Sequence, residues 1–428
     1  MYITIGIPTY TKLKNLTYAP EVDVSGASVP INGVSVDIIT GDAIDRGMEL
    51  FLYDDLDTLF CRYTIVYAEI SAPGVVTVRA ESDVAKLDRV TLPATVYDTD
   101  TEGVLTDIFG SVAAYYTLDA SLSGQTVQGF CPEQSARDRL AWLCLVLGAY
   151  VKHCFNESIE ILPVKQAQTL IPYERTFYRP TTVYRDFVTS YTVTAYQFRE
   201  GTPETTDEWV KDSGGVTYIV TKTEATAAPP QGSVPAGAVG VAMRTDDVML
   251  VRPGNLSAVL SRLSTYYFNR LEVDLDCINN GEFTPGMRVI GYTGEDSLIT
   301  GYIQRADFRF GKQARSTLHI VGVAATQAAK LTVTYMYDGT KLGSAAYTLP
   351  VGYQYSIPNP YLDKTRKKVR RIYRPLTEAA EGTMAQGANA VTVQYDVALE
   401  LKNGILSVIS VDDVEIEVDG ENYVGVIS

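Results

Sequence analysis

A stretch of alternating apolar and polar residues between positions 281 and 323 constrains the fold most strongly. It reads GEFTPGMRVIGYTGEDSLITGYIQRADFRFGKQARSTLHIVGV and parses as four strands joined by tight turns. Pro285-Gly286 is a turn dipeptide, and residues 293–296 and 310–313 supply the later turns. Period-two alternation between glycine-rich turns is typical of an antiparallel sheet with one buried face. We therefore expect a small β-barrel here, in which no residue pattern indicates catalysis.

Length and composition indicate a globular, multidomain protein. At 428 residues the chain exceeds what one core usually supports, so we expect two to four domains. Its 36 Lys and Arg residues against 51 Asp and Glu residues give a formal net charge of −15, which argues against a uniformly basic nucleic-acid-binding surface. Tyrosine is common, with 29 residues against 12 Phe, and this bias favours strands and contact surfaces.

The cysteine and histidine content disfavours a zinc site. The five cysteines are odd in number and form no Cys-x-x-Cys pair, and only His153 and His319 are available as imidazole ligands. We expect buried free thiols in a protein made in a reducing compartment. The N-terminus does not have the pattern of a signal peptide, and no apolar run reaches the ~18 residues of a membrane span. Synthesis in the cytoplasm is therefore expected.

We predict a mainly β fold with an α+β insertion, divided into five regions. In order they are a first β-barrel domain (1–92), an α/β insertion (93–165), a β-rich middle domain with a loop (166–250), a second β-barrel domain (251–326) and a C-terminal β-rich domain (331–428). Residues 22–39 and 271–278 alternate and are predicted to be extended, and residues 327–330 are predicted to be a linker.

Four helices are expected from apolar periodicity and capping residues. They cover residues 83–87, residues 100–112 with Asp100 or Thr101 as the cap, residues 135–151 with Ser135 and Asp138 as a capping box, and residues 256–269 capped by Asn255.

The residues most able to carry chemistry have simpler structural explanations. Asp54, Asp55 and Asp57 fit a solvated turn better than a cation site. His153 is adjacent to Cys154, and neighbouring side chains diverge, so we expect a surface or capping histidine instead of a Cys/His nucleophile. No nucleotide-binding glycine motif or nucleophile elbow is present. We therefore predict no catalytic residue, no cofactor and no metal, and His319 is expected to be a solvent or interface residue.

One cluster of basic residues stands out in this acidic chain. It could bind an anionic partner such as a glycan or nucleic acid, or it could keep an exposed edge strand from pairing with itself. The two explanations remain open. The cluster comprises Lys364, Arg366, Lys367, Lys368, Arg370, Arg371 and Arg374.

Several segments in sequence order carry a family resemblance. They are LFLYDDLDTLFCRYTIVYAEI, LDRVTLPATVYDTDTEGVLTDIF, SARDRLAWLCLVLGAYVKH, NLSAVLSRLSTYYFNR and ITGYIQRADFRFGKQARSTLHIVG. Their order and spacing over residues 1–325 resemble the baseplate hub, or tail hub, family of tailed phages and contractile injection particles.

The resemblance implies a structural protein of the virion tail or of an injection particle. It implies a homotrimer in which two barrels per subunit form a pseudo-six-fold, tube-forming ring. The implied partners are a tail tube or distal tail protein, a central spike or fibre and a tape-measure protein, with DNA passing through the lumen without specific binding. We expect contacts between subunits to involve Pro285, Gly286, Tyr302, Gln304 and His319.

Residues 331–428 differ from a basic hub. LTVTYMYDGTKLGSAAYTLPVGYQYSI followed by VTVQYDV is similar to the β-grasp-like repeat of mucin-binding adhesins. The alternative function is therefore a receptor-binding, adhesin-like tail tip protein whose C-terminal domain contacts host glycans or the envelope. A wall-degrading enzyme is the least favoured class.

Overall fold

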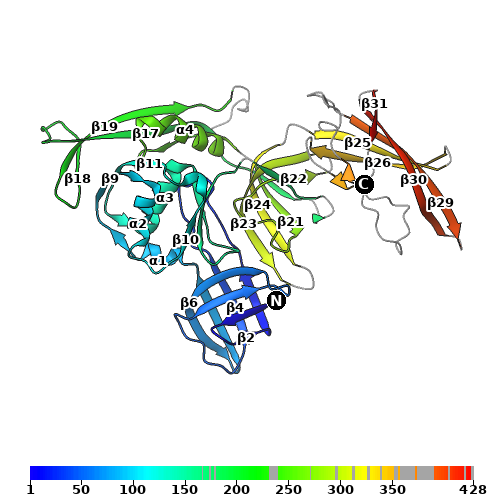
Figure 1. The fold of residues 1–428 in the computed structure, drawn as a ribbon, viewed down its shortest axis with the longest axis horizontal. Coiled ribbons are helices and arrows are strands. Elements are labelled where there is room, and N and C mark those ends of the chain that lie inside the picture. Colours follow the sequence, from blue (N-terminus) through cyan, green and yellow to red (C-terminus); the bar gives the residue numbers. More distant parts are fainter. Residues whose placement is uncertain are drawn as a thin grey trace. The chain divides into compact units, whose positions relative to one another are not determined.

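The computed structural model describes two compact units. The first comprises Met1–Thr169, Glu174–Val289 and Gly301–Val323, and the second comprises Leu170–Tyr173, Ile290–Thr300 and Ala324–Ser428. Strands dominate both, which confirms the mainly β prediction (Figure 1). The described residues are 1–165, 167–172, 175–177, 180–230, 240–269, 271–294, 297–310, 314–324, 328–337, 340–350, 355–356, 372–373, 390–402, 405–418 and 421–425.

One large sheet runs through the first unit. Its main path places strands that are distant in sequence side by side, and β15 (Gln168–Leu170) and β22 (Arg288–Gly294) pair beside that path. The order along the path is β16 (Thr181–Tyr184), β21 (Leu271–Ile278), β24 (Arg315–Ala324), β23 (Ser297–Arg309), β3 (Leu13–Tyr18), β4 (Gly33–Ile39), β7 (Val75–Glu81), β6 (Leu59–Ala72), β5 (Glu49–Tyr53), β1 (Tyr2–Ile5) and β2 (Thr9–Tyr10).

The pairing of β23 with β3 joins the two regions that were expected to be separate barrels. Phe308 is the register partner of Tyr18, and their rings stack with centroids 5.7 Å apart. Phe60 from β6 and Phe155 complete the joint, with the Phe60 centroid 5.0 Å from Phe155 and 5.3 Å from Phe308. Contact among these four aromatic rings, three of which are buried, stabilises this joint by the hydrophobic effect and by edge-to-face packing.

The described residues between 281 and 323 contain three strands, not four. β22 begins at Arg288, β23 at Ser297 and β24 at Arg315. The segment preceding Arg288 is a turn, because Gly286 adopts a φ of +90° that interrupts an extended chain. In contrast, residues 271–278 form β21 with the predicted limits.

Residues 22–39 also differ from the prediction, since only Gly33–Ile39 forms a strand. The Asp23 carboxylate accepts hydrogen bonds from the backbone N–H groups of Ser25 at 2.9 Å and Ser28 at 3.0 Å. These bonds close a tight loop in place of a strand. Gly26 adopts a φ of +77° there, and a Cβ on it would lie 2.7 Å from the carbonyl oxygen of Ala149.

The helices lie mostly where the sequence places them, with corrected ends. Asp100 caps the second helix by accepting the Gly103 N–H at 2.8 Å, as expected, and Ser135 caps the third by accepting the Asp138 N–H at 3.1 Å. The third helix ends before Gly148, which is left-handed, so it is shorter than predicted. The helices are α1 (Val84–Asp88), α2 (Thr101–Phe109), α3 (Ala136–Leu147) and α4 (Pro253–Phe268), with the 3₁₀ turn η1 (Ala120–Leu122).

Asn255 does not cap α4 as predicted. The helix begins three residues earlier than predicted, at Pro253, and the Asn255 side chain accepts the N–H of the N-cap residue Arg252 at 2.8 Å. Proline at the first helical position explains the earlier start, because it has no N–H to leave unsatisfied.

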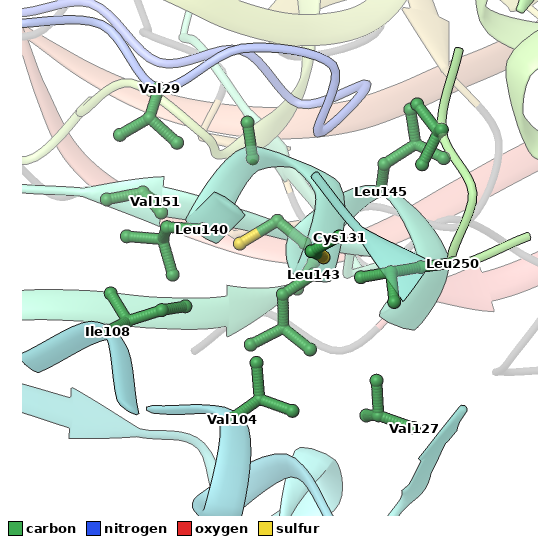
Figure 2. Close-up of a cluster of buried hydrophobic side chains, with 14 of the residues drawn as sticks. Val29, Val104, Ile108, Val127, Cys131, Leu140, Leu143, Leu145, Val151 and Leu250 are labelled. Carbon is green, nitrogen blue, oxygen red and sulfur yellow. The ribbon is translucent and has the colours of Figure 1, made fainter. Parts of the chain in front are cut away.

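A shared apolar core unites these helices with small sheets around them (Figure 2). Leu140 and Leu143 of α3 are fully buried beside Val104 and Ile108 of α2, and Leu250 also joins the cluster. The surrounding strands are β8 (Thr91–Leu92), β9 (Thr95–Asp100), β10 (Tyr116–Leu118), β11 (Thr126–Cys131), β12 (Gln134–Ser135), β13 (Ala149–Lys152) and β14 (Ile159–Pro163).

A four-stranded sheet packs against α4. The strand order of this sheet is β18 (Trp209–Lys211), β19 (Thr217–Ala227), β17 (Val188–Glu200) and β20 (Val241–Thr245). β17 pairs in parallel with β20 and antiparallel with β19, and it contributes Val193 and Ala195 to the core just described.

The second unit also has a β-sheet of its own. Its five-stranded sheet has a parallel pair, β25 and β29, between antiparallel neighbours. β25 begins at Ala328, inside residues 327–330, which were predicted to be a linker. The sheet order is β26 (Thr340–Pro350), β25 (Ala328–Tyr337), β29 (Ala390–Lys402), β30 (Ile405–Val418) and β31 (Glu421–Gly425), and β27 (Tyr355–Ser356) pairs with β28 (Ile372–Tyr373).

Candidate interface surfaces

The outward face of β21, β24 and β23 carries a ladder of charged groups. Alternation buries Leu318 and Ile320 of β24 and turns His319 to the opposite face, as the sequence predicted. The register places Asp274 of β21 directly opposite His319. Side chains opposite one another in adjacent strands are close enough to interact, so side-chain contacts connect β21 with β24 on this face.

His319 bridges two carboxylates. Its Nδ1 lies 2.6 Å from Asp274 Oδ1 and its Nε2 lies 3.0 Å from Asp307 Oδ2, while Arg305 Nε lies 2.6 Å from the other oxygen of Asp307. Partial burial acts to raise the pKa of Asp307, but hydrogen bonds from His319 and Arg305 outweigh it and lower that pKa. The predicted interface histidine is therefore part of an intramolecular hydrogen-bond network.

Tyr302 and Gln304 have internal partners of their own. The Tyr302 hydroxyl donates to the carbonyl oxygen of Lys165 at 3.2 Å, and its ring packs against the cluster that contains Val22 and Tyr150. Gln304 donates its side-chain N–H to the Tyr266 hydroxyl. Both side chains are half-buried, so they connect β23 to neighbouring elements.

Pro285 and Gly286 are buried within the chain. A Cβ on Gly286 would lie 2.4 Å from the Tyr150 ring, which packs directly on the turn. A partner that contacts this turn would therefore meet the residues next to Pro285 and Gly286, among them the exposed Glu282.

The basic residues between Lys364 and Arg374 lie outside the described residues, as does Glu295 in the predicted turn after Gly294. All five cysteines are buried free thiols, as expected. Within the described ranges, no group of three or more His, Cys, Asp or Glu side chains is arranged to hold a metal ion. No helix among those ranges has the length and apolar character needed to cross a membrane.

His153 is a corrected prediction, because it is buried inside the chain instead of lying at the surface. Its Nδ1 accepts the backbone N–H of Asp83 at 3.2 Å, at the start of α1, and its carbonyl oxygen accepts the Tyr63 hydroxyl at 3.0 Å. Burial lowers the pKa of His153 to about 4, despite the opposing effect of the Asp83 carboxylate. The side chain is therefore a neutral structural acceptor.

Among the described residues, the two strands at the ends of the large sheet pair with a neighbour on one side only. β16 forms one end, and all four of its side chains, Thr181 to Tyr184, are exposed. β2 forms the other end. An edge strand presents backbone groups that another chain can pair with, so these two edges are candidate contact sites that residue patterns alone did not identify.

Sequence reasoning also missed a hollow on the outward side of β5 and β6. Phe51 and Tyr53 alternate with the buried Leu50 and Leu52 and therefore lie on the outward face of β5. Large aromatic side chains on an outward face are the sequence signal that could have indicated this hollow.

Comparison with known proteins places this fold among phage tail proteins. No family model and no curated protein matches the chain. The 43 kDa tail protein of prophage MuSo2 from Shewanella oneidensis is 10% identical, with a TM-score of 0.51 over 75% of this chain and 98% of that one. The tail protein from Neisseria meningitidis MC58 has the same identity and TM-score over 75% and 95%.

A prophage tail protein, gp18, from Listeria monocytogenes EGD-e is 13% identical, with a TM-score of 0.48 over 73% of this chain and 90% of that one. The Shewanella and Neisseria structures show that the chain shares the fold of tail proteins, which confirms the predicted resemblance at the level of fold. The resemblance of residues 331–428 to adhesin repeats finds no support in these comparisons.

Proposed function

We propose that this chain is the structural hub of a phage or phage-like tail tip. The observation that carries the proposal is the fold shared with two tail proteins over three quarters of the chain. Three copies form a ring in which the regions 1–92 and 251–326 act as six similar barrel positions. That ring joins a hexameric tail tube to a central spike or fibre, and its role is assembly instead of catalysis.

The two open edges of the large sheet supply a way to close the ring. β2 and β16 lie at opposite ends of one strand path, so the β2 edge of one copy can pair with the β16 edge of the next. A head-to-tail contact of this kind uses two different surfaces of the chain. It forms a closed ring when a whole number of equal rotations from one copy to the next completes a full turn. In the trimer, main-chain hydrogen bonds continue the sheet from one copy to another.

Charge supports the passage of DNA through such a ring. The net charge of −15 leaves no excess of cations to hold a polyanion, and a protein binds DNA non-specifically by neutralising phosphates with Lys and Arg. An acidic ring lets DNA move through it without specific binding.

A charge on the β16 edge tests the assembly. Val183 is 52% exposed, so Val183→Lys should leave the folded chain intact while blocking strand addition, because an edge lysine disfavours pairing. Val241→Lys is the matched control, since Val241 is 55% exposed on β20, at the edge of a different sheet. We expect monomers from the first variant and trimers from the control in sedimentation velocity. Trimers from both would refute the β16 contact.

A further inference from the structure

A hollow of about 580 Å³ lies in the first unit, where β5 and β6 meet the loops before β10 and β14. Its volume is within the range of small-ligand sites, ~300–1,000 Å³. The residues that line it come from four separate stretches of the chain: Glu49, Phe51, Arg62, Tyr115, Glu157 and Ser158.

Aromatic rings form the apolar part of the hollow. The Arg62 guanidinium carbon lies 5.9 Å from the centroid of Phe51 and 6.0 Å from that of Tyr115, between two rings from different elements. The strip continues through Tyr53, which stacks on Phe51 at 6.3 Å, and Tyr2, which stacks on Tyr53 at 5.1 Å. Tyr115 is 72% exposed, so its ring is accessible to a ligand from solvent.

The polar groups of the hollow are held in place by the chain itself. Arg62 Nη2 lies 2.5 Å from Glu49 Oε1, which fixes the guanidinium. The Asn156 side chain accepts the N–H groups of Glu157 at 2.7 Å and Ser158 at 3.4 Å, which shapes the loop that carries them. The hollow thus combines guanidinium donors, carboxylate acceptors and a hydroxyl group.

We infer that this hollow binds a neutral oligosaccharide. The apolar C–H face of a sugar ring packs on an exposed aromatic ring, here Tyr115, and sugar hydroxyls both donate and accept hydrogen bonds. The carboxylates of Glu49 and Glu157 accept from such hydroxyls, and Arg62 donates to them. An apolar wall with a few fixed polar groups is the usual composition of a small-ligand site.

The charges of the hollow disfavour other ligand classes. Two carboxylates face one guanidinium, so an anionic sugar or a single-stranded nucleic acid meets net repulsion. A cationic ligand would need the space between the rings of Phe51 and Tyr115, which Arg62 already occupies. A neutral polyhydroxyl compound can hydrogen-bond to the charged groups of the hollow and pack on its rings while the Glu49–Arg62 ion pair stays intact.

Saturation-transfer NMR on the full-length protein tests this inference with cellotetraose, chitotetraose and maltotetraose as probes. We expect saturation transfer to at least one of them, and we expect Tyr115→Ala to weaken that binding by about tenfold or more. Glu157→Gln should weaken it as well, because one acceptor oxygen becomes a donor. Trp209→Ala is the matched control, since Trp209 is 54% exposed on β18, and it should leave sugar binding unchanged.

Three results would overturn the inference. They are no saturation transfer to any of the three sugars, binding that survives Tyr115→Ala, and a change in assembly state on Tyr115→Ala without sugar binding by the parent protein. The last would identify the hollow as a protein contact. The site lies within one chain, so this test is separate from the test of the trimeric hub.

Discussion

Acid should destabilise this protein through His153. Burial lowers the pKa of His153 to about 4 in the folded chain, against an ordinary value of 6.5. Between these two values the unfolded chain binds a proton that the folded chain does not, so the free energy of unfolding falls as the pH falls. Well above pH 6.5 the residue is neutral in both states and contributes no pH dependence.

The size of the effect follows from the same linkage. One pKa unit corresponds to about 1.4 kcal/mol, so the loss attributable to His153 is about 1.4 kcal/mol near pH 5.5 and about 3 kcal/mol near pH 4. Protonation would also remove the acceptor that Nδ1 offers to the Asp83 N–H. The destabilisation is therefore expected to begin at the junction of α1 with His153.

His153→Asn tests this reasoning, because an amide oxygen can still accept the Asp83 N–H but does not titrate. Urea unfolding followed by tryptophan fluorescence, with Trp142 in the apolar core, gives the free energy of unfolding at about pH 7.5, 5.5 and 4.5. The variant should be less stable at neutral pH, through lost ring packing against Tyr63, and should lose less stability on acidification. His319→Asn is the control, and it should keep the loss of unfolding free energy on acidification that His153 causes. If the free energy of unfolding fell equally with pH in His153→Asn and in the parent protein, the account of His153 as a buried neutral histidine would be refuted.

Three further substitutions test the fold. Ser135→Ala removes the cap of α3 and should cost about 1 kcal/mol in urea unfolding; an unchanged midpoint would contradict the cap. Gly26→Ala should cost more than about 1 kcal/mol, because φ is +77° and backbone atoms surround the new Cβ, whereas Gly41→Ala, with open space around it, is the control. Asp107→Asn should destabilise the chain by about 2 kcal/mol, since it removes the carboxylate 3.0 Å from fully buried Arg139; Asp98→Asn, at an exposed site, should not.

Local patterns predicted much of the fold. The cap of α2 at Asp100 and the limits of β21 follow from capping chemistry and strict alternation, both of which depend on neighbouring residues. Residues 22–39 alternate as well, but the Asp23 carboxylate closes a loop with nearby N–H groups, and side-chain hydrogen bonds of that kind compete with strand formation. The pairing of Phe308 with Tyr18 joins strands far apart in sequence, which no local pattern reveals.

The candidate sites were less predictable because their contacts are distant in sequence. Alternation within β24 gave the face of His319, but its carboxylate partners lie on β21 and β23. The Tyr150 ring that covers Gly286 comes from β13, so the burial of that turn depends on tertiary packing. The same holds for the hollow at Tyr115.

The mass of the purified chain in solution tests the central claim most directly. Sedimentation equilibrium should give about 141 kDa, three times the chain mass of 46.9 kDa, as expected for a closed three-fold ring. A single species of 46.9 kDa at every concentration up to about 100 µM, or an open series of growing oligomers, would contradict the hub.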